Sequence, residues 1–330
     1  MRILNTPIKI GAMEVKNRLV MAPMATAKST EDGKITPEIR GYYHEKTAGG
    51  YIGLVIMEHS YISPEGQAGR RQISIAGDDD INGLKSVVEM VHKNGSPIMA
   101  QINHAGGAAK SEITGRPALG ASAVSTPRYE AAPCEMTAED IKKTVRDFAA
   151  AALRAKQAGF DGVELHSAHG YLLNQFYSPL SNKRRDAYGG DTIEGRVRLH
   201  IEIIQAVRAA VGGDYPLALR LGACDYMEGG TVLEDSVAAA RLLEKAGLDL
   251  LDISGGFCGY VRPDASGQGY FGELTEAIKG AVHIPVILTG GITEGAAAEK
   301  LLEQGKSDLI GVGREIVKDS LWAKRAILGE

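Results

Sequence analysis

The chain has 330 residues, of which 44% are hydrophobic and 24% charged, a composition typical of a folded globular protein and not of a disordered chain. A formal net charge of −4 at pH 7 argues against nucleic acid or an anionic membrane as a partner, so we expect small molecules instead. The three cysteines, Cys134, Cys224 and Cys258, show no CxxC spacing, which favours the cytoplasm. No segment has the pattern of a signal or membrane-spanning sequence, so we expect no membrane partner.

The first predicted element is a β-hairpin. Segments 7–10 and 13–16 flank the pair Gly11–Ala12, which is typical of a tight turn. The hairpin precedes all the other predicted strands, and we expect it to be structural, closing one end of the sheet that they form.

Eight short β-rich segments then alternate with longer amphipathic segments. The predicted strands are 18–22, 52–57, 97–102, 162–166, 216–221, 250–253, 285–289 and 308–312, and the clearest predicted helices are 139–158, 194–210, 233–246 and 296–304. This alternation predicts a parallel sheet. Eight units favour a closed (β/α)₈ TIM barrel over a doubly wound open sheet, because no strand leads into a GxGxxG turn.

Two long connections follow the third and sixth strands. They span residues 103–133 and 255–269 and are rich in glycine, together with alanine, serine and proline. Connections of this length are often functional, so we expect both rim loops to border the active site. No repeat or linker divides the chain, and residues 1–330 are predicted to form a single domain.

Polar side chains stand where several predicted strands end. Gln101 lies near the end of the third strand, His166 and His169 at the end of the fourth, and Arg220 near the end of the fifth. Chemistry in TIM barrels takes place at this edge, where buried polar groups need a polar ligand. We therefore expect a ligand to meet these four side chains.

Glycines follow the last two strands. Thr289–Gly290–Gly291 and Gly311–Val312–Gly313 expose backbone N–H groups, and Arg314 adds a positive charge, which together predict a phosphate site. The alternative is that these glycines only form tight turns.

The two histidines are three residues apart and can present two N–H donors to one carbonyl oxygen. A metal pair is the competing interpretation, but no third ligand has a suitable spacing, so we predict no metal; both rings could also be satisfied without any function. Tyr171 is a candidate general acid, and its alternative is packing against the rim.

With these motifs the chain resembles the Old Yellow Enzyme family of flavin oxidoreductases, near the bacterial ene-reductases and the barrel part of dienoyl-CoA and 2-enoate reductases. The resemblance covers nearly the whole chain and rests on PIKIG (7–11), KNRLVMAPM (16–24), GFDGVELH (159–166), HGYLL (169–173), Ser178–Pro179, Asn182 and RDAYGG (185–190). It implies bound FMN, NADH or NADPH as a transient hydride donor, and an enone as the substrate.

The resemblance also implies residue roles. Gly290, Gly291, Gly313 and Arg314 would hold the FMN phosphate, and Arg220 would lie beside the N1–O2 edge of the flavin. The isoalloxazine would meet Pro23, Met24, Ala25, His59, Gln101 and His166. His166 and His169 would bind the substrate's carbonyl oxygen while Tyr171 protonates its α-carbon.

Some positions depart from the family pattern. Ala25 stands where relatives often have Cys or Thr, Ala27 replaces an aromatic residue, and His59 replaces a small one. The small side chains of Ala25 and Ala27, together with the long glycine-rich loops, favour a bulky planar enone such as a flavone. The chain is also expected to lack the iron–sulfur segment and second flavin domain of the long relatives.

Two other functions and the oligomeric state stay open. A flavin-carrying subunit that passes electrons to a partner protein is the alternative function. A phosphate-binding lyase or isomerase would need a Lys or carboxylate base at a strand end, and none is placed that way. A homo-oligomer stays open as well.

Overall fold

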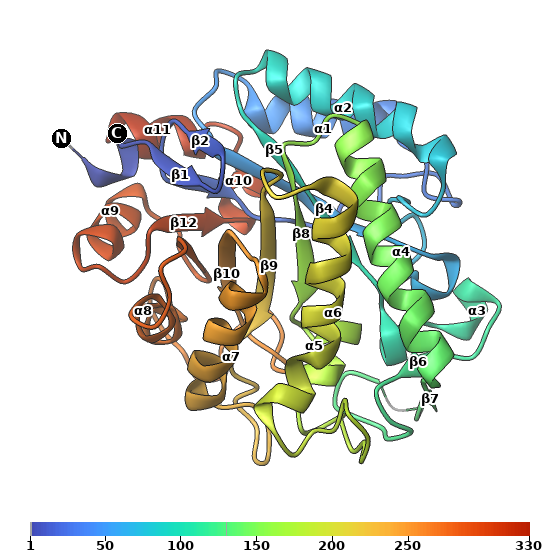
Figure 1. The fold of residues 1–330 in the computed structure, drawn as a ribbon. Helices are drawn as coiled ribbons and strands as arrows, with labels where there is room; N and C mark the ends of the chain where they lie inside the picture. The colour runs from blue at the N-terminus through green and yellow to red at the C-terminus, as the bar shows by residue number, and fades with distance from the viewer. Residues whose placement is uncertain (1, 130) are drawn as a thin grey trace.

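The computed structural model describes residues 2–129 and 131–330, which form a closed barrel of parallel strands surrounded by helices (Figure 1). Neighbouring strands follow each other in chain order, and the last strand pairs with the first to close the barrel. The barrel strands are β3 (Leu19–Met21), β4 (Leu54–Tyr61), β5 (Ile98–Asn103), β8 (Gly162–Ser167), β9 (Leu217–Gly222), β10 (Leu250–Ser254), β11 (Val286–Thr289) and β12 (Leu309–Val312). The predicted TIM barrel is confirmed.

Helices form the outer layer of the barrel. They are α1 (Pro37–Thr47), α2 (Ile81–Lys93), α4 (Ala138–Gln157), α6 (Ile193–Val211), α7 (Leu233–Ala246), α8 (Gly272–Lys279), α9 (Gly295–Glu303) and α11 (Trp322–Leu328), with the short α3 (Ser111–Thr114), α5 (Leu172–Tyr177) and α10 (Arg314–Lys318). The helices predicted from the sequence lie within one residue of α4, α6, α7 and α9. In α4 the start is set by a capping box, in which Thr137 accepts from the backbone N–H of Asp140.

Strand β4 differs most from its prediction, because it begins two residues later and runs four residues further. Its pairing with β5 shifts register between Met57 and Ser60, so Glu58 and His59 lie in a bulge. A bulge re-aims side chains and is common beside active sites. The polar pair does not continue the apolar run on which the strand prediction rested, which explains the difference.

The predicted N-terminal hairpin is present and closes the barrel floor. Strand β1 (Ile8–Ile10) pairs antiparallel with β2 (Met13–Val15), and Gly11 in the turn adopts φ 56°. Ile10 and Val15 are fully buried in one cluster with side chains inside the barrel. Those partners are Val20, Leu54, Ile56, Met99, Ala218, Leu250, Ile287 and Leu309.

A polar layer lies above this apolar layer, two residues further along the strands. Because side chains alternate along a strand, residues two positions beyond an interior residue also point into the barrel. The layer consists of Gln101, Glu164, Arg220, Asp252 and Thr289, none of which is more than 6% exposed. The barrel therefore has a dry apolar base and a polar upper part.

The two predicted rim loops follow β5 and β10. The first contains α3 and β6 (Leu119–Gly120), and β6 pairs in parallel with β7 (Cys134–Glu135) just beyond the loop. The second reaches α8 without regular structure. Across the described residues, every helix is too short or too polar to cross a bilayer.

We predict that Ile10→Ala destabilises the fold through the barrel floor. Removing the buried side chain leaves a cavity that neighbouring strands cannot fill, a loss of about 2–5 kcal/mol in the free energy of unfolding. Urea titration followed by circular dichroism measures the loss. Lys9→Ala, an exposed change on the same strand, is the control and should alter stability by less than about 0.5 kcal/mol. Equal effects of the two changes would contradict the plug.

Candidate functional site

A cavity of about 790 Å³ opens at the carboxyl ends of the barrel strands. Every residue that the sequence analysis assigned to the site lines it: Pro23, Met24, Ala25, His59, Gln101, His166, His169, Tyr171, Arg220, Gly290, Gly291, Gly313 and Arg314. The barrel geometry explains this convergence, because parallel strands end at one rim. Both rim loops border the cavity, as expected, through Pro127, Arg128 and residues 257–261.

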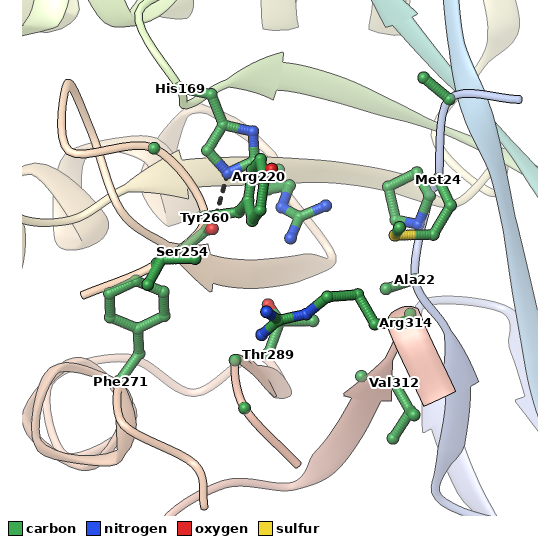
Figure 2. A pocket seen from close by; sticks show the side chains of 18 of the residues that line it. Ala22, Met24, His169, Arg220, Ser254, Tyr260, Phe271, Thr289, Val312 and Arg314 are labelled. Atoms are coloured by element: carbon green, nitrogen blue, oxygen red, sulfur yellow. Dashed lines mark hydrogen bonds between the residues drawn. The ribbon is translucent and has the colours of Figure 1, made fainter. Parts of the chain in front are cut away.

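One end of the cavity is suited to an anion. The backbone N–H groups of Gly290, Gly291 and Gly313 donate to no backbone carbonyl of the described residues, and all three glycines face the cavity. Gly291 has φ 65°, and a Cβ there would lie 2.4 Å from the Tyr270 ring, so a side chain is excluded. Arg314 extends into the same space (Figure 2). Its Nη2 donates to the Tyr270 hydroxyl at 3.1 Å.

The floor of the cavity is formed by the polar layer. Arg220 extends into the cavity from β9, and its Nε lies 3.2 Å from Oδ2 of Asp252 (Figure 2). Nε2 of Gln101 donates to Oε1 of Glu164 at 2.7 Å. Because the amide nitrogen is engaged by Glu164 on the neighbouring strand, the carbonyl oxygen of Gln101 is left as the acceptor for a ligand.

The other half of the cavity holds His166, His169 and Tyr171. The ring centroids of the histidines are 5.1 Å apart, and those of His166 and Tyr171 are 5.2 Å apart. His169 adopts φ 61°, an unusual conformation for a non-glycine residue, and its Nε2 lies 2.8 Å from Oγ of Ser254 (Figure 2). Nδ1 of His166 is buried without a partner among the described residues.

Burial above all lowers the pKa of both histidines well below the usual value; the neighbouring His169 adds to the effect at His166 and Arg220 to that at His169. Both rings are therefore neutral at pH 7, and each carries one N–H donor. Within the described part of the chain, no three His, Cys, Asp or Glu side chains are grouped as a metal site would require.

His59 enters the site from the β4 bulge. Its Nδ1 lies 3.0 Å from Nε2 of Gln72 and 3.2 Å from Nδ2 of Asn103, both of which are donors, so Nδ1 accepts and Nε2 carries the proton. Burial and then the charge of Arg128 lower the pKa of His59 to about 4. The ring stacks on Tyr171 at a centroid distance of 5.5 Å.

Some lining residues were not identified from the sequence. Arg128 places its guanidinium 5.6 Å from the centroid of the Tyr171 ring, and Tyr260 packs edge-on against His169 at 6.1 Å. Both belong to the rim loops that were expected to border the site. The loop lengths were the signal for the segments, but nothing in the spacing singled out these residues.

The chain is similar to known proteins over nearly its whole length. The profile of the NADH:flavin oxidoreductase / NADH oxidase family matches residues 3–329. An NADPH dehydrogenase of Bacillus subtilis is 40% identical over 327 residues, covering 98% of this chain and 94% of the relative. An NADH oxidase of Thermoanaerobacter brockii is 39% identical over 324 residues, covering 96% of this chain but only 50% of that longer protein.

Solved structures share the fold as well. A 2-naphthoyl-CoA reductase in complex with 2-naphthoyl-CoA superposes with a TM-score of 0.92 and 29% identity, covering 99% of this chain and 52% of the other. An old yellow enzyme homologue from Zymomonas mobilis has a TM-score of 0.87 and 27% identity, covering 99% and 92%. A morphinone reductase in complex with tetrahydroNAD has a TM-score of 0.85 and 28% identity, covering 99% and 90%.

We predict that His59 makes the fold less stable in mild acid. Its folded pKa of about 4 lies below the unfolded value of about 6.5, so the unfolded chain binds more protons below about pH 6.5 and stability falls there. His59→Asn should remove roughly 2 kcal/mol of the stability lost between about pH 7 and about pH 5. Urea titrations at both pH values measure this difference.

His283→Asn is the matched control, because this histidine is 97% exposed. That variant should lose as much stability between the two pH values as the unmodified protein does. An unchanged pH dependence in His59→Asn would show that the ring is not held neutral by burial.

Proposed function

Because the chain belongs to the NADH:flavin oxidoreductase / NADH oxidase family, the Old Yellow Enzyme family, we propose that it is a single-domain ene-reductase spanning residues 1–330. It is an NAD(P)H-dependent oxidoreductase with FMN as its cofactor. In our proposal the substrate is an α,β-unsaturated carbonyl compound that receives hydride at its β-carbon. The observation that carries the proposal is the meeting of His166, His169 and Tyr171 above the Arg220 side chain in one cavity.

The residues of the cavity fit FMN. Gly290, Gly291, Gly313 and Arg314 offer free N–H groups and a cation to its phosphate, while the carbonyl oxygen of Gln101 suits an N–H of the pyrimidine edge. When bound, FMN supplies the chemistry of accepting hydride from NADH or NADPH and passing it to a second substrate. Arg220, fixed by Asp252 on the neighbouring strand, would stabilise negative charge on the pyrimidine edge without reorganising.

Substrate activation falls to the histidine pair and Tyr171. The neutral rings of His166 and His169 would both donate to the substrate's carbonyl oxygen and draw electron density from the β-carbon. Tyr171, whose ring stacks on His59, would donate its phenolic proton to the α-carbon. The left-handed backbone at His169 is the local strain that turns this ring toward its partner.

A bulky planar enone such as a flavone is the substrate class that we propose. Ala25 presents only a methyl group to the cavity, and the aromatic rings of Phe257, Tyr260 and Tyr270 line it. Small and aromatic walls suit a flat apolar ligand. Among the similar structures, one reductase is in complex with 2-naphthoyl-CoA, whose naphthoyl group is planar and bicyclic.

A second candidate is a flavin-carrying unit that passes electrons to a partner protein. The observation that favours it is that this chain matches only about half of the NADH oxidase of Thermoanaerobacter brockii and of a metal reductase of Desulforamulus reducens. This candidate requires no role for Tyr171. The two functions therefore differ in what reoxidises the reduced protein.

We predict that Tyr171→Phe separates the two half-reactions. Loss of the acid should slow reoxidation by cyclohexenone or a flavone by about 10²–10⁴-fold while leaving reduction by NADH or NADPH intact. Anaerobic stopped-flow absorbance in the flavin band measures both steps. Tyr260→Phe, which alters a tyrosine at the cavity mouth, is the matched control and should reoxidise normally. If Tyr171→Phe is reoxidised as fast as the unmodified protein, Tyr171 is not the acid. If no enone reoxidises the unmodified protein, the second candidate is favoured.

We also predict that Arg314→Ala weakens binding of FMN but not of riboflavin. Arg314 is exposed, so its charge-assisted contact with the phosphate should be worth about tenfold in the dissociation constant. Quenching of flavin fluorescence during titration of the flavin-free protein measures both constants. Riboflavin, which lacks the phosphate, is the internal control. A parallel loss for both ligands would place Arg314 elsewhere on the cofactor.

A further inference from the structure

Glu164 is a buried carboxyl group that the proposed chemistry does not use. It lies on β8, is 0% exposed, and stands in register with Gln101 on β5. Its Oε1 accepts from Nε2 of Gln101 at 2.7 Å, and its Oε2 is buried without a partner among the described residues. A charged group in this position would be costly unless it were balanced.

The polar layer contains two carboxyl groups and one cation. Arg220 lies 3.2 Å from Asp252, which leaves Glu164 without an ion pair within the described residues. The equivalent interior positions on β12 and β3 are Gly311 and Ala22, which carry no charge. On β4 the bulge turns Glu58 away from the layer, to Thr26 and Tyr43. Charge balance therefore requires one proton on the carboxyl pair.

The hydroxyl of Thr289 favours the ionised form of Asp252, because a hydrogen bond donated to that carboxylate lowers its pKa and so leaves the proton to Glu164. The hydroxyl lies 2.7 Å from Oδ1 of Asp252 and 2.7 Å from the carbonyl oxygen of Ile253. Burial and the charge of Asp252 raise the pKa of Glu164 to about 8, against the opposing effect of Arg220. Glu164, which is further from the guanidinium, is the group that carries the proton at pH 7.

We propose that Glu164 is a positioning residue for the cofactor: it holds the amide of Gln101 with its oxygen toward the cavity and carries the proton that balances the layer beneath it. The inference rests on the proposed function, because it takes Gln101 and Arg220 to face the pyrimidine edge of FMN. It assigns Glu164 no contact with substrate.

A proton balance follows from this arrangement. Hydride transfer from the nicotinamide to bound FMN would bring two electrons and one proton, and it would add one negative charge for Arg220 to stabilise. At low pH Glu164 is already protonated and takes up nothing. Above its pKa it is a carboxylate in the oxidised protein, and the added charge above makes it bind one proton from the solvent. Reduction then consumes one more proton than at low pH.

The experiment is a measurement of the midpoint potential of the bound FMN from about pH 6 to about pH 10. In the unmodified holoprotein we expect the plot of potential against pH to steepen near pH 8, where the second proton begins to be taken up. Glu164→Gln keeps the shape of the side chain but not the titration, so its plot should have no such bend. A bend that persists in Glu164→Gln, or that is absent from the unmodified protein, overturns the proposal.

Glu58→Gln is the matched control. Glu58 is also buried, on β4, but it contacts Thr26 and Tyr43 outside the polar layer, and its pKa is raised to about 7 by burial. Its removal should leave the bend near pH 8 in place. Loss of the bend in this variant would assign the proton to Glu58 and overturn the role of Glu164.

Asp252→Asn is the second test, and it holds even if Glu164→Gln does not fold. With one carboxyl group left opposite Arg220, Glu164 should ionise more readily and the bend should move to lower pH. An unmoved bend would contradict the shared proton.

Infrared spectra recorded without flavin test the same group. The carbonyl band of a protonated acid should disappear at high pH in the unmodified protein and be missing from Glu164→Gln. If the protein binds no FMN, the proposed function is wrong. The infrared band still tests the protonation of Glu164, because it needs no bound flavin.

Discussion

The balance of charge inside the closed barrel is the constraint on which the site depends. Arg220 and Asp252 form an ion pair at 3.2 Å where neither is more than 6% exposed. Removing one partner of such a pair is strongly destabilising, because the remaining buried charge is neither paired nor solvated by water. The pair holds the guanidinium at a fixed height, and the apolar layer and hairpin below exclude solvent from beneath it. A rigid cation at the base of the cavity is the result.

The two ends of the cavity differ in charge. The glycines and Arg314 provide free N–H groups and a positive charge at the anion end, while the opposite half holds neutral rings. Burial and nearby guanidinium groups keep His166 and His169 uncharged, so they act as hydrogen-bond donors without competing for the anion. One ligand with a phosphate at one end and a planar ring system at the other matches this division.

Much of the site was predictable because parallel strands that end at one rim must bring their terminal residues together. His166, Arg220 and Gly290 needed only the position of each strand in the sequence. Glu164 was not predictable as a proton carrier, because its environment depends on the register of β8 against β5 and on charges two strands away. Arg128 was missed for a related reason, since the path of a long loop leaves no periodic signal in the sequence. The direction of the His59 side chain was not predictable either, because it depends on the β4 bulge, which no pattern in the sequence indicates.

The closure of the barrel by its first and last strands bears on how the chain folds. Strand β3 pairs with β12, and the Arg2 guanidinium donates to the carbonyl oxygen of Ala326, 324 residues away. Contacts between such distant residues form slowly, because the loop they close is nearly the whole chain. During synthesis the hairpin emerges first, but the barrel whose floor it closes is incomplete until β12 has left the ribosome. The anion end, built from β11 and β12, is therefore the last part of the cavity to be completed, and FMN can bind there only after translation is almost finished.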